Sequence, residues 1–182
     1  MATEIRTNWY NGKIMINLGR QIVQALMVDP KRVRLVDDAA ELSGRELLGE
    51  IKLKSRKLRQ MGLKSGDYLV VTCDRGAEFW VDCIASWIMG AVTICIQKNP
   101  EDKLVETLLS KVSPVGILNG DMPVPKNLSN LRNFSLLPSV VARDDVGSDE
   151  DLLTNVAEYP KEAAVLFTSG TTGVPKGVLL TH

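Results

Sequence analysis

The C-terminal part of the sequence concentrates side chains that can hold an anion. Residues 168–177 read Thr-Ser-Gly-Thr-Thr-Gly-Val-Pro-Lys-Gly, between two apolar stretches at 163–166 and 178–180. Glycine lets the backbone turn and approach a ligand closely, and successive N–H groups in such turns form a concave surface that favours anions. The hydroxyl groups add donors, and Lys176 adds a mobile positive charge after the stiff Pro175. These residue types predict a loop that binds an anionic group.

This loop differs from the Walker A phosphate loop, in which glycine precedes the lysine and Ser or Thr follows it. Here Pro175 precedes Lys176, and Gly177 follows it. A Walker A loop also opens a helix whose N-terminus holds the phosphates, whereas the apolar stretch after Gly177 predicts a strand. We therefore expect a flap between two strands, which grips phosphate through backbone amides, hydroxyls and Lys176. The alternative is a solvent-exposed Gly/Thr hairpin that binds nothing.

The run Thr-Ser-Gly-Thr-Thr-Gly-x-Pro-Lys-Gly at 168–177 resembles the signature of the adenylate-forming superfamily. That family includes acyl- and aryl-CoA synthetases, adenylation domains of non-ribosomal peptide synthetases, and luciferases. Residues 42–47, 62–67 and 90–92 are similar to further family landmarks and occur in the same order. Residues 96–100 depart from the pattern, because the family commonly has a proline at or near Ile96.

The resemblance implies a substrate, cofactors and site residues. Family members join a small carboxylic acid to ATP, release pyrophosphate, and mostly pass the acyl group to a thiol. It thus implies ATP and Mg²⁺ for the full-length enzyme, and CoA or a phosphopantetheine thiol as acceptor. Lys176 would stabilise the charge of the leaving pyrophosphate, and no acid, base, nucleophile or metal ligand is assigned. The residues implied to hold the ATP phosphates are Thr168, Ser169, Gly170, Thr171, Thr172, Gly173 and Lys176.

Length also bears on function, because members of the resembled family are much longer than 182 residues. We expect residues 1–182 to be a single α/β subdomain, the first part of the large N-terminal domain of an acyl-CoA-synthetase-like ligase, and to be inactive alone. The alternatives are a peptide-synthetase adenylation domain, a non-catalytic nucleotide- or phosphate-binding module, and an interaction fragment with a vestigial loop. Truncation would expose apolar surface and a strand edge, which predicts self-association into a homo-oligomer.

Composition excludes several other classes of protein. The hydrophobic content of 45%, the charged content of 24% and the formal net charge of zero predict a globular core without a nucleic-acid partner. Cys73, Cys83 and Cys95 lie in apolar surroundings without C-x-x-C spacing, which favours reduced, buried thiols and a cytoplasmic location. No metal-binding constellation, signal peptide or membrane span is indicated. The sole histidine, His182, matches a family histidine near the acyl site, but we expect it to be frayed.

The apolar periodicity predicts an α/β fold with a largely parallel sheet flanked by helices. The expected helices span 14–28, 43–61, 76–89 and 101–112. The expected strands span 33–37, 41–42, 68–73, 92–96, 115–118, 162–167 and 178–181, with one more within 134–141 and loop at 119–133. Ser43 and Glu46 are spaced as a capping box, and Gly62 suits the position after a helix end.

Two features admit a functional and a structural interpretation. The second helix is basic, so it has either a solvated outer face, which we favour, or a membrane or nucleic-acid patch. Its basic residues are Lys52, Lys54, Arg56, Lys57 and Arg59. Trp80 and Trp87 recur at helical spacing, and we expect both to pack in the core rather than line a substrate pocket.

Overall fold

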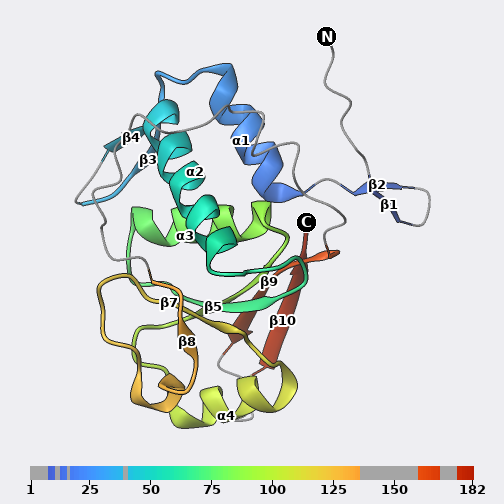
Figure 1. Cartoon of the computed structure of the whole chain (residues 1–182), viewed down its shortest axis with the longest axis vertical. Coiled ribbons are helices and arrows are strands. Elements are labelled where there is room, and N and C mark those ends of the chain that lie inside the picture. The colour runs from blue at the N-terminus through green and yellow to red at the C-terminus, as the bar shows by residue number, and fades with distance from the viewer. Residues whose placement is uncertain (1–7, 11–12, 16, 39–40, 136–159, 169–175) are drawn as a thin grey trace.

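A six-stranded sheet forms the centre of the protein (Figure 1). The computed structural model describes residues 8–10, 13–15, 17–38, 41–135, 160–168 and 176–182. In the sheet order β10-β9-β6-β5-β7-β8, neighbours are parallel except β9 and β10, which are antiparallel. The strands are β5 (Tyr68–Thr72), β6 (Val92–Ile96), β7 (Gly116–Leu118), β8 (Arg132–Asn133), β9 (Glu162–Thr168) and β10 (Lys176–Thr181). The predicted largely parallel α/β architecture is confirmed.

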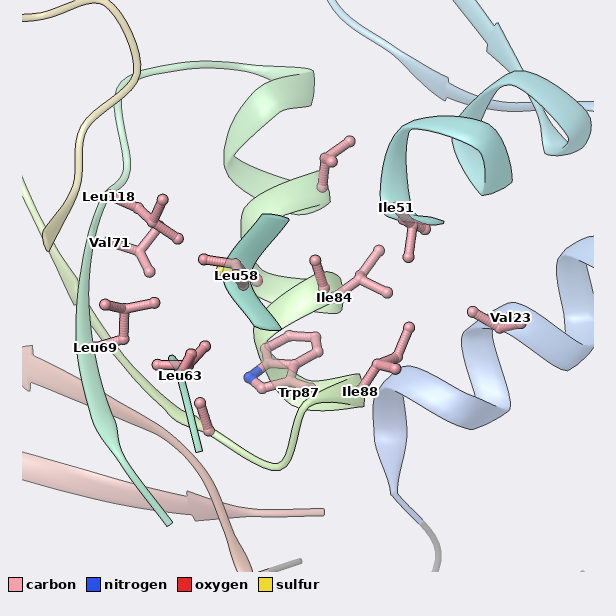
Figure 2. Packing of buried hydrophobic residues seen from close by; sticks show 14 of the residues in the cluster. Val23, Ile51, Leu58, Leu63, Leu69, Val71, Ile84, Trp87, Ile88 and Leu118 are labelled. Atoms are coloured by element: carbon pink, nitrogen blue, oxygen red, sulfur yellow. The ribbon is translucent and has the colours of Figure 1, made fainter. Parts of the chain in front are cut away.

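Helices cover both faces of this sheet. On one face lie α1 (Leu18–Val28), α2 (Gly44–Gln60) and α3 (Ala77–Ile88), and on the other lies α4 (Asp102–Lys111) (Figure 1). Alternate residues of β5 therefore enter two cores: Leu69 and Val71 join the cluster of α1 to α3, whereas Val70 joins Leu108 of α4. Burial on both faces explains why the middle of this strand, residues 69–71, is a continuous apolar run. Figure 2 shows Leu69 and Val71 on the side of Leu58.

Short elements complete the described fold. β1 (Asn8–Tyr10) and β2 (Lys13–Met15) form an antiparallel hairpin, and β3 (Val33–Val36) pairs with β4 (Glu41–Ser43) as the expected returning strand. The 3₁₀ helix η1 (Lys126–Leu128) and β8 lie within the segment expected to be loop, so that expectation was wrong there. β8 adds to β7 at Arg132–Asn133. The separate short strand expected within 134–141 falls mostly on residues 136–141, which lie outside the described chain.

The first helix starts later than predicted. Ile14 pairs with Trp9 in the β1–β2 hairpin, and α1 begins at Leu18. Asn17 caps it, because the side-chain oxygen accepts a hydrogen bond from the N–H of Arg20 at 3.1 Å. Asparagine is a strong N-cap residue. Because the apolar spacing typical of a helix continues upstream to Ile14, the sequence did not reveal Asn17 as the N-cap.

The predicted caps of α2 are confirmed. The Ser43 hydroxyl accepts from the Glu46 N–H at 3.3 Å, and the Glu46 carboxylate accepts from the Ser43 N–H at 2.9 Å. Gly62 has a φ of 84° just after the helix, and the Leu63 N–H donates to the Leu58 carbonyl at 3.0 Å. That positive φ is why glycine suits this position.

The solvated basic face predicted for α2 is wrong for two of its lysines. Lys52 is buried, and the Lys54 ammonium lies 2.8 Å from the carboxylate of Asp82, which is fully buried. The cysteine prediction holds for Cys83, which is buried, while Cys73 and Cys95 are half-buried; all three are free thiols. No helix in the described ranges is both long enough and apolar enough to cross a bilayer.

Candidate functional site

The predicted anion-binding loop joins β9 to β10. Thr168 is the last residue of β9 and Lys176 the first of β10, and the two pair directly across the antiparallel ladder. Ser169, Gly170, Thr171, Thr172 and Gly173 lie outside the described residues, as does Pro175. The predicted strand after the loop is confirmed and starts at Lys176, so the loop does not open a helix as a Walker A loop does.

The direction of β9 places the two ends of the loop at a defined edge of the sheet. β9 runs parallel to β6, which runs parallel to β5, so the chain leaves β9 at the same edge where these strands end. In open α/β sheets, ligands bind in the crevice outside the carboxyl ends of the strands. Lys176 is exposed at this edge. This is the edge at which a ligand of the predicted loop would bind.

Trp87 fixes the position of β9. Its indole Nε1 donates to the carbonyl of Ala163 at 2.9 Å and contacts the hydroxyl of Thr93 at 3.1 Å. The Trp87 carbonyl in turn accepts from the Nδ2 of the buried Asn17 at 2.6 Å. Figure 2 shows its ring between Leu63 and Ile88. The core position predicted for Trp87 is confirmed, whereas Trp80 is 47% exposed, so the same prediction for Trp80 is wrong.

Gly177 serves the packing of the hairpin rather than a turn. It pairs with Phe167 on β9. A Cβ at this position would lie 3.3 Å from the Phe167 ring and 3.4 Å from the Val165 side chain. Glycine therefore lets the phenylalanine ring lie across the neighbouring strand, close to the loop.

His182 is held in place at the end of β10. Its Nδ1 accepts a hydrogen bond from the N–H of Leu18 at 3.1 Å, and its own N–H donates to the carbonyl of Lys161 at 3.1 Å. The frayed end expected for this residue is therefore wrong. Burial lowers the pKa of the imidazole to about 4, although the nearby carboxylate of Glu162 opposes this effect. The neutral ring joins the loop hairpin to the start of α1.

We expect the stability of the protein to fall as the pH drops from about 6.5 to about 4. The folded state holds His182 neutral with its pKa near 4, against 6.5 unperturbed, so acid favours the unfolded chain, which binds the proton first. NMR can follow the imidazole signals directly, because the chain has one histidine. Titration near 6.5 in the folded protein would contradict the buried contact, and a His182→Gln variant should lose this part of the pH dependence of the melting temperature.

A cluster of charged side chains lies inside the fold, where β5 ends. The carboxylate of Asp82, on α3, lies 2.8 Å from the Lys54 ammonium and 2.5 Å from the Arg75 guanidinium. The Arg75 Nε also donates a hydrogen bond to the Thr72 hydroxyl at 3.0 Å. Sequence reasoning missed this cluster. The signal was an acidic residue inside a helix that is otherwise apolar nearly all round, which needs a buried cation as partner.

The loop hairpin presents apolar side chains to solvent. Leu166 of β9 and Val178, Leu179 and Leu180 of β10 are all at least 39% exposed. β10 is also the last strand of the described sheet. Exposed apolar residues along an edge strand form a surface that can pair with another chain. Self-association through this surface stays a prediction.

The chain belongs to the AMP-binding enzyme family, whose model matches residues 23–182. The resemblance read from the 168–177 run is thereby confirmed.

Its relatives differ in what their names say they act on. It is 28% identical over 159 residues to the medium/long-chain-fatty-acid–[acyl-carrier-protein] ligase FadD10 of Mycobacterium tuberculosis, covering 82% of this chain and 29% of that protein. It is 27% identical over 157 residues to tyrocidine synthase 2 of Brevibacillus parabrevis, covering 84% of this chain and 4% of that protein. The chain thus spans less than a third of the length of these relatives.

A solved structure shows the same fold. The N-terminal subdomain of NpsA from Klebsiella oxytoca aligns with a TM-score of 0.68 and 23% identity, over 92% of this chain and 42% of that one. The likeness supports the α/β fold with helices on both sides of the sheet.

Proposed function

We propose that this chain is the part of an AMP-forming ligase that holds the phosphates of ATP. The full-length protein would join a carboxylic acid to ATP, release pyrophosphate, and pass the acyl group to the thiol of CoA. The observation that carries the proposal is the pairing of Lys176 with Thr168 at the carboxyl edge of the sheet. It brings the two ends of the Gly/Thr loop together and leaves the lysine exposed there.

The proposed contribution of this site to the reaction is electrostatic stabilisation of negative charge. When an acid attacks the α-phosphorus, negative charge develops on the leaving pyrophosphate. The ammonium of Lys176 stabilises that charge, while the hydroxyls of Thr168, Ser169, Thr171 and Thr172 and the amides of the loop glycines hold the β- and γ-phosphates. No proton transfer is assigned to these residues, because positioning and charge supply most of the catalysis in phosphoryl chemistry.

Magnesium enters this proposal as the usual counter-ion of ATP. Within the described ranges, no group of three or more His, Cys, Asp or Glu side chains could hold a metal ion. No described residue is therefore assigned to magnesium.

The acceptor thiol divides the proposal into two versions. FadD10 is named as a ligase that charges an acyl carrier protein, and tyrocidine synthase 2 is named as a synthase. The first name favours the phosphopantetheine thiol of a carrier protein as the alternative to CoA. A further alternative is the adenylation domain of a peptide synthetase. We propose that this chain alone is inactive, because the parts of the resembled family that contact adenine, the acid and the thiol follow the loop.

Replacing Lys176 by alanine should weaken the binding of ATP or pyrophosphate to the purified chain about tenfold to a hundredfold. A charge-assisted hydrogen bond contributes about 1.5–3 kcal/mol, which corresponds to that range. Isothermal titration calorimetry of the chain and the variant measures the change. Lys126→Ala is the matched control, because Lys126 is also exposed but lies on η1.

Two outcomes would count against the proposal. If the chain and its Lys176→Ala variant bind ATP and pyrophosphate with equal affinity, Lys176 does not contribute to the binding site. No binding of either ligand by the chain would favour a vestigial loop. ATP–pyrophosphate exchange by the chain alone would contradict only its proposed inactivity.

A further inference from the structure

A pocket lies on the face of the fold that carries α1, α2 and α3. Its volume is about 250 Å³. The pocket is lined by side chains of α1, β3, α2 and α3, and none of its lining residues belongs to β9 or β10. The apolar lining residues are Ile22, Ala25, Leu26, Leu35, Leu47, Trp80 and Ile84. It is therefore separate from the hairpin to which the proposed function assigns the nucleotide.

One charged side chain, the guanidinium of Arg34, lies among these apolar lining residues. Arg34 of β3 lines the pocket and is exposed. Leu26 and Leu47 are buried at the pocket's inner side, while Trp80 is half exposed at its outer side. A planar guanidinium with several donors matches a carboxylate in particular, because the two groups can form paired hydrogen bonds. The lining thus forms an open apolar groove that contains one guanidinium able to bind a carboxylate.

We infer that this pocket binds a monocarboxylate with an apolar tail of about eight carbons, with its carboxylate on Arg34 and its tail against Trp80 and Leu35. The size follows from the volume, which is slightly below the roughly 300 Å³ at which pockets for drug-sized ligands begin. Small apolar ligands in preformed cavities bind chiefly through the contacts of the tail. This site binds an acid without reacting with it, since no nucleotide-binding element borders it.

The structure supplies an internal reporter for the test. Trp80 lines the pocket, while Trp87 is buried in the core next to Ala163. Titration of the complete chain with 8-bromooctanoate should therefore quench fluorescence, because the bromine reaches Trp80. In a Trp80→Phe variant, most of this quenching should disappear.

The length of the acid tests the tail, and its charge tests Arg34. From butanoate to octanoate, affinity measured by calorimetry should rise about fourfold for each added methylene and then level off at dodecanoate. Octan-1-ol should bind about tenfold more weakly than octanoate. Arg34→Gln should weaken octanoate about tenfold, whereas Arg59→Gln, which removes an exposed arginine of α2 outside the lining, should leave it unchanged.

Filling the pocket is the decisive variant. Ala25 lines the pocket from the exposed side of α1, so Ala25→Phe should occupy it without disturbing buried residues and abolish octanoate binding. Circular dichroism confirms that the variant is folded. Lys176→Ala should bind octanoate like the original chain, which separates this site from the proposed nucleotide loop. Absence of octanoate binding at millimolar concentration, or binding that persists in Ala25→Phe or Arg34→Gln, would overturn the inference.

Discussion

Replacing Asp82 by alanine is expected to destabilise the protein by about 3–5 kcal/mol. Asp82 is fully buried and is the shared partner of Lys54, at 2.8 Å, and Arg75, at 2.5 Å. Its removal leaves the two cations with the half-exposed Glu78 in place of their buried counter-charge, and breaking a buried pair in this way costs several kcal/mol. Urea unfolding followed by circular dichroism measures the loss. Arg75 also holds Thr72, so the end of β5 should loosen as well.

Glu78→Gln is the matched control for that experiment. Glu78 lies one turn earlier on α3 and contacts the same two cations, Arg75 at 2.8 Å and Lys54 at 3.7 Å, but its side chain is 43% exposed. Exposed ion pairs contribute about 0–1 kcal/mol. Similar losses for the two variants would show that Asp82 is not the buried centre of this cluster.

The second large effect is expected at Trp87. Truncation to alanine should cost about 3–5 kcal/mol, because a buried aromatic ring leaves a large cavity. Its effect should be greatest at β9, since the indole donates to the carbonyl of Ala163 there. Hydrogen exchange of the amides of β9 and β10, with urea unfolding for the total loss, measures both parts. Protection lost equally from β5 and β9 would contradict a local role for this contact.

Two further variants separate the causes of that loss. Trp87→Phe keeps most of the ring volume and removes the donor, so it should cost about 1–2 kcal/mol. Trp80→Ala serves as the control at a half-exposed tryptophan of the same helix and should cost less than Trp87→Ala. If Trp80→Ala lowers the free energy of unfolding as much as Trp87→Ala does, the special role of the buried Trp87 is contradicted.

Local signals in the sequence predicted the local structure well. The alternation of helices and strands between residues 43 and 118, the Ser43–Glu46 capping box and Gly62 were all read correctly, because each depends on neighbours within a few residues. The strand nature of the segment after Gly177 was also predicted, and with it the difference from a helix-opening loop. The family followed from ten consecutive residues.

Features that depend on distant contacts were not predicted. The sequence does not show that β9 lies beside β6, with Thr93 opposite Ala164, or that β10 turns back along it. Lys54 was expected in solvent because its helix is basic; the partner that draws it inward lies on another helix. The anchoring of His182 by Leu18 likewise joins residues from opposite ends of the sequence.

The position of β9 in the sheet sets an order in which the protein can assemble. The β5–β6 pair forms across one short crossover through α3, whereas β9 reaches β6 only after the chain has built α4, β7 and β8. Contacts between residues far apart in sequence form slowly, since a long loop must close first. We therefore expect β9, the strand that leads into the loop, to join the sheet late in folding, after the helical face has formed.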